Sequence, residues 1–104
     1  MYFDDEYLER YSRQLIMPEI SESGQKRLIS SKVLIVGAGG LGSPVISILS
    51  GAGIGNITIV DFDKVELSNL NRQFVHNLET IGFSKTYSSE VFVKKLNPET
   101  KITT

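Results

Sequence analysis

Blocks of apolar residues along the chain predict an α/β fold with a parallel sheet. Residues 33–36 and 57–60 are short, β-branched runs of the kind found in buried parallel strands. Between them apolar residues recur at helical spacing, and glycines in 51–55 end this helix. Proline fits only its first turn, where Pro44 stands. The residues that mark the helix are Leu41, Val45, Ile48, Leu49 and Ala52.

The segment before the first strand is predicted to be helical. Residues 4–15 mix acids, arginines and aromatics as a short amphipathic helix would, and Pro18 interrupts it. Ser21 or Ser23 is a candidate N-cap for a second helix that runs to residue 29. The polar, solvent-facing side of this helix is expected to carry Gln25, Lys26 and Arg27. We therefore separate an N-terminal helical segment, 1–31, from the strand-rich part, 32–104.

The second half of the chain predicts a long loop, a helix and a strand. Residues 61–83 are polar and are read as a loop with one helical turn; loops of this length are usually functional or disordered. Ser84 is the expected cap of a helix that ends at Asn97, which precedes a proline. Residues 101–104 begin a third strand. The helix is marked by Tyr87, Val91 and Leu96, and Tyr87 and Phe92 are expected in the core.

Composition removes several classes of function. The 104 residues carry a formal net charge of −1, which provides no basic field for nucleic acid or an anionic membrane. The uncharged stretch 33–60 is rich in glycine and interrupted by polar residues, so it does not predict a membrane span. The absence of cysteine excludes disulfides, thiolate metal sites and a cysteine nucleophile within these residues. The expected location is cytoplasmic.

A glycine-rich motif between the first strand and the helix predicts a nucleotide site. Gly37, Gly39 and Gly42 have the G-x-G-x-x-G spacing, which allows a tight turn, close approach to phosphate and close packing of helix on strand. Asp61 ends the next strand about 20 residues after Gly42, where an acid is expected to bind a ribose hydroxyl. The alternative is that the glycines serve packing alone.

The residues after Asp61 favour a triphosphate over a nicotinamide dinucleotide. Arg72 can bind phosphate oxygens in a bidentate manner, and Lys85 can bring its ammonium to the same anion. Carboxylates and amides precede Arg72 in the loop. Asp63 and Glu66 have the alternative reading of simple turn residues that solvate it. His76, the one histidine, is expected to be structural, because no second ligand or base lies near it.

Taken together, these motifs resemble the ThiF, MoeB and HesA adenylyltransferases, relatives of the enzymes that activate ubiquitin. The resemblance covers almost the whole chain and rests on several motifs in order. They are 10–14 (RYSRQ), 24–25, 37–42, 61–63, 68–73 (SNLNRQ), Gly82 with Lys85, and 97–98. The implied fold is a Rossmann-like parallel sheet with a glycine-rich nucleotide loop, of which residues 32–104 form the N-terminal part.

The resemblance implies ATP with Mg²⁺ as cofactors and a small ubiquitin-like carrier protein as partner. The carrier's C-terminal carboxylate would attack the α-phosphate and give an acyl-adenylate. Catalytic roles would fall to Arg72 and Lys85, and to Arg13, which in the family's dimers reaches into the partner's ATP site. We therefore expect a homodimer. The nucleotide would be bound by Gly37, Gly39, Gly40, Gly42, Asp61, Asp63, Ser68, Asn69, Asn71, Arg72 and Lys85.

Other parts of the family pattern are expected beyond residue 104. These are the aspartate that ligates magnesium, any catalytic cysteine and the paired Cys-x-x-Cys zinc motifs. A second interpretation is therefore an inactive nucleotide-binding or dimerisation module. The carrier and the pathway, whether thiamine, molybdopterin, tRNA thiolation or a peptide product, stay open.

Overall fold

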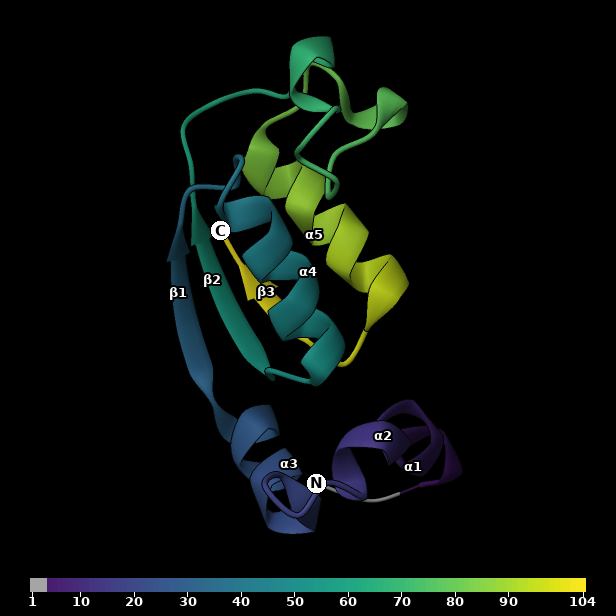
Figure 1. Ribbon diagram of the computed structural model, residues 1–104. Coiled ribbons are helices and arrows are strands. Elements are labelled where there is room, and N and C mark those ends of the chain that lie inside the picture. The colour runs from purple at the N-terminus through teal and green to yellow at the C-terminus, as the bar shows by residue number, and fades with distance from the viewer. Residues whose placement is uncertain (1–3) are drawn as a thin grey trace.

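A three-stranded parallel sheet forms the centre of the molecule. The computed structural model describes residues 4–104, so the first three residues of the predicted helical segment 1–31 lie outside the described residues. The strands β1 (Lys32–Val36), β2 (Asn56–Val60) and β3 (Lys101–Thr103) lie in that order across the sheet. All three carboxyl ends therefore point to one end of the molecule, the upper end in Figure 1.

Two helices cover one face of this sheet. Helix α4 (Gly42–Ala52) connects β1 to β2, and α5 (Lys85–Leu96) precedes β3; both lie on the same side (Figure 1). Between helices and sheet lies an apolar core of β-branched residues, with Ile35, Ile46, Ile57, Ile59, Val75 and Val93 among its buried members. The predicted α/β fold with a parallel sheet is confirmed. The predicted bounds of β1 and β2, 33–36 and 57–60, agree with the structure to within one residue, because the residues of these strands that face the core are strongly apolar.

The sequence spacing misidentified the buried face of α4. Ile46 is fully buried, together with Ser43 and Ser50. Of the residues that marked the predicted stripe, Leu41, Val45 and Ile48 are exposed, whereas Leu49 packs against the core as predicted. The two serines are buried against the loop and the end of α5, since Oγ of Ser43 accepts from the N–H of Val75 and the carbonyl of Ser50 accepts from Nδ2 of Asn97. The helix also runs to Ala52 before Gly53 ends it in a left-handed conformation at φ 101°.

The limits of α5 agree with the sequence, but its buried face does not. Ser84 caps the helix as predicted, since its Oγ accepts a hydrogen bond from the backbone N–H of Tyr87. The residues that α5 buries are Lys85, Ser88, Ser89 and Val93. Phe92 packs against the core as expected, whereas Tyr87 is exposed and stacks at 5.2 Å on Phe83. The expectation of a core Tyr87 is therefore wrong.

Three helices precede the sheet and lie at its opposite, amino end (Figure 1). They are α1 (Asp5–Arg10), α2 (Ser12–Leu15) and α3 (Ser21–Ser30), so the single helix predicted over 4–15 is interrupted at Tyr11. Neither Ser21 nor Ser23 caps α3: the N-cap position is Ile20, and no side chain caps it. Ser21 adopts a positive φ of 56° at the turn into the helix.

Buried amides attach these helices to the C-terminal end of α4. Gln25 was expected to face solvent but is fully buried, because its Nε2 donates to the backbone oxygen of Ala52 at 3.0 Å. Gln14 donates to the same oxygen at 2.9 Å. Asn97 extends the attachment by donating to the hydroxyl of Tyr11 at 2.8 Å. An amide that satisfies a buried carbonyl can be buried at little cost, which explains the wrong prediction for Gln25.

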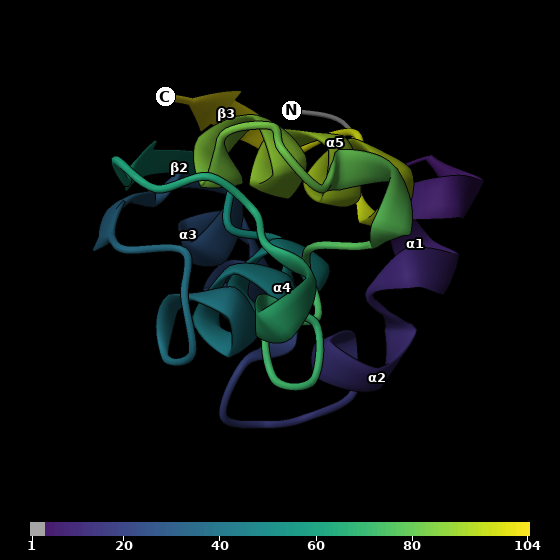
Figure 2. The same ribbon diagram turned by 90° about the horizontal axis from the view of Figure 1, so that it is seen from above.

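The loop over residues 61–83 contains two 3₁₀ turns, η1 (Leu67–Asn69) and η2 (Leu78–Thr80), where one helical turn was expected. It lies over the carboxyl ends of the strands and beside α5, as the view from above shows (Figure 2). The sheet face away from α4 and α5 exposes Leu34 and Val36 on β1. Within residues 4–104, no helix has the length and apolar character needed to cross a bilayer.

Candidate nucleotide-binding site

The glycine loop joins β1 to α4 at the carboxyl edge of the sheet. Gly37 extends the β1 ladder, since its N–H donates to the backbone oxygen of Val60 at 2.7 Å, and then turns the chain at φ 101°. At Gly42 a side chain is impossible, because a Cβ there would overlap the carbonyl oxygen of Gly37. The chain thus turns tightly onto α4. At Gly40, by contrast, the space that a Cβ would enter is open, so this residue lies on the accessible side of the loop.

Asp61 ties the end of β2 to this loop. Its Oδ2 accepts a hydrogen bond from the backbone N–H of Ala38 at 2.8 Å, and its Oδ1 accepts from the N–H of Asp63 at 2.7 Å. Each carboxylate oxygen can accept a further hydrogen bond. The half-buried carboxylate therefore lies beside the glycine loop with remaining capacity to bind a hydroxyl, as the sequence predicted for a ribose.

Lys85 is brought to the same edge by a short backbone pairing. The N–H of Lys85 donates to the backbone oxygen of Asp63 at 3.0 Å, and Lys64 pairs with Ser84 as an isolated antiparallel bridge. The side chain of Lys85 is only 8% exposed, and its Nζ lies 3.9 Å from Oδ2 of Asp63. A largely buried lysine side chain at this edge of the sheet is favourably placed to attract an anion, because water screens its charge little.

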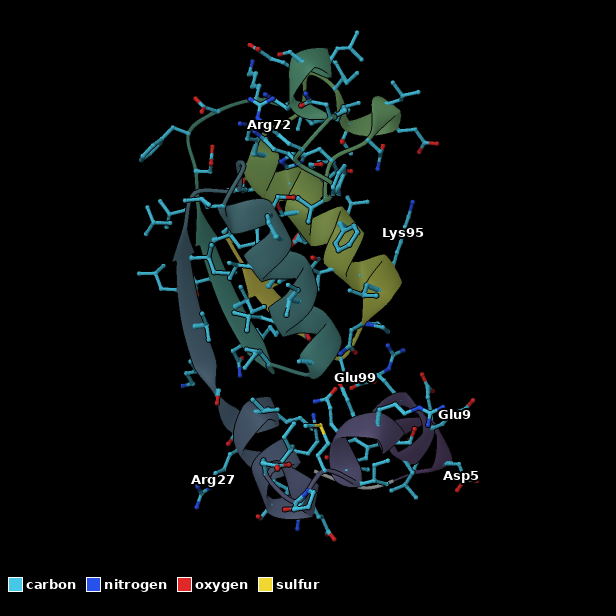
Figure 3. The ribbon with its side chains drawn as sticks, viewed as in Figure 1. Asp5, Glu9, Arg27, Arg72, Lys95 and Glu99 are labelled. Atoms are coloured by element: carbon cyan, nitrogen blue, oxygen red, sulfur yellow. The ribbon has the colours of Figure 1, made fainter. Side chains whose placement is uncertain are left out.

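The remaining predicted binding residues lie on and after η1. Arg72 is exposed and held in place by its Nη1, which donates to the backbone oxygen of Ser68 at 3.0 Å and to Oδ1 of Asn71 at 2.8 Å. Figure 3 shows Arg72 at the end of the molecule that carries the glycine loop. Asn69 is buried, and its Oδ1 caps η1 by accepting from the N–H of Glu66 at 2.9 Å. In this structure the side chain of Asn69 thus stabilises the 3₁₀ turn η1.

A layer of buried polar residues supports the glycine loop from behind. Nε2 of His76 lies 2.9 Å from the backbone oxygen of Ala38, and Oγ of Ser43 accepts from the N–H of Val75 at 3.1 Å. The amide of Gln73 lies against Gly39, and its Oε1 is buried with no hydrogen-bond partner among residues 4–104. The sequence expectation that His76 is structural agrees with these contacts. The supporting role of this layer was missed, since nothing in the sequence marks which polar residues of the loop turn inward.

Burial also sets the charge state of His76. It lowers the pKa of His76 below its usual value of 6.5, and the nearby positive charge of Lys85 lowers it further. The Ala38 carbonyl and the charge of Asp61 oppose this change, but burial has the largest effect. His76 is therefore neutral at pH 7.

Arg13 is not brought to this site within one chain. It lies on α2, at the amino end of the sheet, whereas the glycine loop lies at the carboxyl end (Figure 1). A cleft of about 460 Å³ lies at that amino end, between α1 and the turns before β2 and β3, and residues such as Tyr7, Tyr11 and Glu99 line it. This cleft lies at the opposite edge of the sheet from the glycine loop, so it is separate from the candidate nucleotide site.

Candidate metal ligands do not cluster in the part of the chain that the structure describes. No group of three or more His, Cys, Asp or Glu side chains within residues 4–104 is arranged to hold a metal ion. Both oxygens of Asp61 already accept backbone hydrogen bonds, and Asp63 faces the ammonium of Lys85. Mg²⁺ at nucleotide sites is usually held by one or two carboxylates together with phosphates.

The chain is similar in sequence to known proteins. The SAMP-activating enzyme E1 of Haloferax volcanii is 48% identical over 99 residues, which are 95% of this chain and 37% of that protein. The adenylyltransferase and sulfurtransferase UBA4 of Candida albicans is 54% identical over 95 residues, 90% of this chain and 22% of that protein. The present chain thus spans less than half the length of these relatives.

A solved structure has a similar fold. The Escherichia coli tRNA N6-threonylcarbamoyladenosine dehydratase TcdA in complex with ATP superposes with a TM-score of 0.89 at 27% identity; the match covers 99% of this chain and 42% of that chain. The family model described as "ThiF family" matches residues 11–104. The match begins at Tyr11 and includes the glycine loop, Asp61, Arg72 and Lys85. The chain belongs to the ThiF family.

Proposed function

We propose that this chain forms the ATP-binding part of an adenylyltransferase that activates the C-terminal carboxylate of a ubiquitin-like carrier protein. The observation that carries the proposal is the line of contacts from Ala38 through Asp61 and Asp63 to Lys85. It brings a hydroxyl acceptor and a buried ammonium to the edge of the sheet where the glycine loop turns. Relatives named adenylyltransferase and a neighbour crystallised with ATP support it.

In the proposed reaction a carboxylate oxygen of the carrier attacks the α-phosphorus of ATP. A new P–O bond forms to the carboxylate, and the bond from the α-phosphorus to the oxygen that bridges to the β-phosphorus breaks, so that pyrophosphate leaves with the bonding electrons. Negative charge grows on the phosphate oxygens during this displacement. Arg72 and Lys85 stabilise this charge, Lys85 more effectively because it is shielded from water.

Asp61 positions the nucleotide by accepting a hydrogen bond from a ribose hydroxyl. The backbone of the glycine loop contacts the phosphates, with Gly40 on its accessible side. Ser68 and Asn71 hold Arg72 in place through its guanidinium. Each of these roles is compatible with the hydrogen bonds that the side chain makes in the structure.

We propose further that Arg13 acts in a homodimer. Because α2 lies at the far end of the sheet from the glycine loop of its own chain, Arg13 can serve a nucleotide only in a second copy. A guanidinium supplied in trans adds positive charge to the phosphates without being buried in the free protein. Mixing Arg13→Ala chains with Arg72→Ala chains tests this, since only the mixed dimer can restore one complete site.

Titration calorimetry with ATP and Mg²⁺ tests nucleotide binding. We expect Asp61→Ala and Arg72→Ala each to weaken binding at least about tenfold, as loss of a charged hydrogen bond would. Lys95→Ala is the matched control, because Lys95 is an exposed cation on α5, away from Arg72 in Figure 3. Equal binding by all four proteins, or no binding, would contradict the proposal.

A second candidate is a nucleotide-binding module without turnover. Pyrophosphate exchange into ATP, measured with ubiquitin-like carrier proteins, separates the two. Exchange above background supports the adenylyltransferase, whereas tight ATP binding without exchange supports the module.

A further inference from the structure

We propose that His76 is a positioning residue for the glycine loop: its imidazole holds the carbonyl of Ala38 and thereby fixes the loop in its binding conformation. The inference rests on the proposed function in one respect, namely that the loop binds a nucleotide. It concerns a residue that does not touch the ligand. His76 is 5% exposed and lies behind the loop.

Ala38 is held from two sides. Its N–H donates to Oδ2 of Asp61 at 2.8 Å, and its carbonyl oxygen lies 2.9 Å from Nε2 of His76. The two partners come from different parts of the chain, the end of β2 and the loop before η2. The neighbours of Ala38 are Gly37 and Gly39, which have the widest conformational freedom of any residue. Fixing the residue between two glycines therefore removes most of the freedom of this turn.

The carbonyl of Ala38 determines which nitrogen of His76 carries the proton. A carbonyl oxygen accepts hydrogen bonds and cannot donate, so Nε2 must be protonated. Nδ1 lies 2.7 Å from Oγ of Ser88, a hydroxyl that can either donate or accept. In neutral His76 with Nε2 protonated, Nδ1 is an acceptor, and the Ser88 hydroxyl can donate to it only by turning away from Oγ1 of Thr80, to which it donates at 2.8 Å.

Protonation of His76 would rearrange this network. Oγ of Ser88 also lies 2.8 Å from Oγ1 of Thr80, and its single hydrogen can serve only one of the two contacts. When Nδ1 is protonated it becomes a donor, and the Ser88 hydroxyl turns to Thr80. The charged groups that act on His76 are Lys85 from α5 and Asp61 from the end of β2. Neutral His76 therefore adds no positive charge near Lys85, whereas protonated His76 would.

Two more contacts join residues 73–76 to the glycine loop and to α4. Oγ of Ser43, in the first turn of α4, accepts from the N–H of Val75 at 3.1 Å, and the amide of Gln73 lies against Gly39. Residues 73–76 therefore form a support along the whole turn. A loop that is rigid before ligand binding loses less entropy when it binds phosphate. The physical role of His76 is this preorganisation.

The test compares two substitutions of His76 with a distant control. His76→Phe keeps an aromatic ring but removes both hydrogen bonds, whereas His76→Gln can place an amide N–H near the Ala38 carbonyl. Thr100→Val is the control, because Thr100 is equally buried and donates to a backbone carbonyl, that of Ile54, at 2.8 Å. That contact lies at the amino end of the sheet, away from the glycine loop.

The first measurement is hydrogen exchange of the Gly37 and Ala38 amides by NMR without nucleotide. We expect His76→Phe to raise their exchange rates about tenfold, as loss of one buried hydrogen bond would, with partial recovery in His76→Gln. The second measurement is ATP affinity by calorimetry, where a similar loss and recovery are expected. Thr100→Val should leave both readouts at the wild-type value while lowering the melting temperature.

The two measurements separate failure of this inference from failure of the proposed function. Wild-type protein that does not bind ATP contradicts the function, while the exchange rates still test the support by His76. Unchanged Gly37 and Ala38 exchange in His76→Phe overturns the inference. If His76→Phe does not fold, Ser88→Ala replaces it: this variant frees Nδ1 and is expected to raise exchange at Ala38. Wild-type exchange there in Ser88→Ala overturns the inference equally.

Discussion

The backbone N–H of Ala38 donates a 2.8 Å hydrogen bond to the carboxylate of Asp61, which joins the turn after β1 to the end of β2. In a parallel sheet these two points are neighbours, although 23 positions separate them in the sequence. The same carboxylate accepts from Asp63 and so also orders the start of the following loop. Asp61 therefore has a structural task besides any contact with a nucleotide.

Substitution of Asp61 should reduce stability as well as binding. Asp61→Ala removes the acceptor for two backbone N–H groups, and we expect the free energy of unfolding to fall by about 1–3 kcal/mol. Asp61→Asn retains one acceptor oxygen, so its free energy of unfolding should fall by less. Urea unfolding followed by circular dichroism gives both values. Equal stability of wild type and Asp61→Ala would show that water replaces the lost acceptor.

The glycines of the loop should differ sharply in their tolerance of alanine. Gly42→Ala places a methyl group on the carbonyl oxygen of Gly37, and we expect a loss of about 3 kcal/mol from overpacking. Gly40→Ala meets no atom, so its stability should stay within about 0.5 kcal/mol of wild type while its affinity for ATP falls. Thermal unfolding and calorimetry on the pair measure both effects. A stable Gly42→Ala protein would contradict the tight turn.

Lys85 should matter more than an exposed lysine of the same helix. Lys85→Met keeps the aliphatic part of the side chain and removes the buried charge, so ATP binding should weaken at least about tenfold. Lys94→Met is the control, because Lys94 is exposed and its Nζ lies 4.0 Å from Oε1 of Glu90, on the same helix. Similar affinities for the two variants would argue against a phosphate contact at Lys85.

His76 should make stability depend on pH. Burial lowers its pKa in the folded state below 6.5, so between that lowered value and 6.5 the unfolded chain binds more protons than the folded one. Stability is therefore complete above about pH 6.5 and falls as the pH drops through this range. The His76→Gln variant should lack this loss of stability at low pH. Urea unfolding from pH 5 to 7.5 measures it as the difference between the two proteins, and parallel curves would rule it out.

Two exposed apolar surfaces should make the chain self-associate. One is the helix-free sheet face with Leu34 and Val36, the latter 76% exposed; the other is the side of α4 with Val45 and Ile48. Exposed apolar area next to the open edge of β1 favours pairing between copies. We expect a dimer or larger species in sedimentation at micromolar concentration. Leu34→Thr with Val36→Thr, compared with Val45→Lys and Ile48→Lys, identifies which surface associates; a monomeric wild type would refute the expectation.

Local chemistry was enough to predict the three strands and the helices α4 and α5 between them. The strands, the cap at Ser84 and the turn at Gly37 depend on residues adjacent in the sequence, and the structure has them where they were predicted. The motif that links the glycine loop to Asp61 was predictable as well, because carboxyl ends of neighbouring parallel strands meet at one edge.

Tertiary packing alone decided which faces of the helices are buried and which polar groups turn inward. Ile46 and two serines of α4 are buried, whereas Ile48, which the spacing had placed on the buried side, is exposed. Gln25 is buried because a carbonyl of α4, 27 positions away, accepts its hydrogen bond, and His76 is held by Ala38 across 38 positions. Such contacts depend on partners that only the folded chain brings together, so sequence periodicity could not predict them.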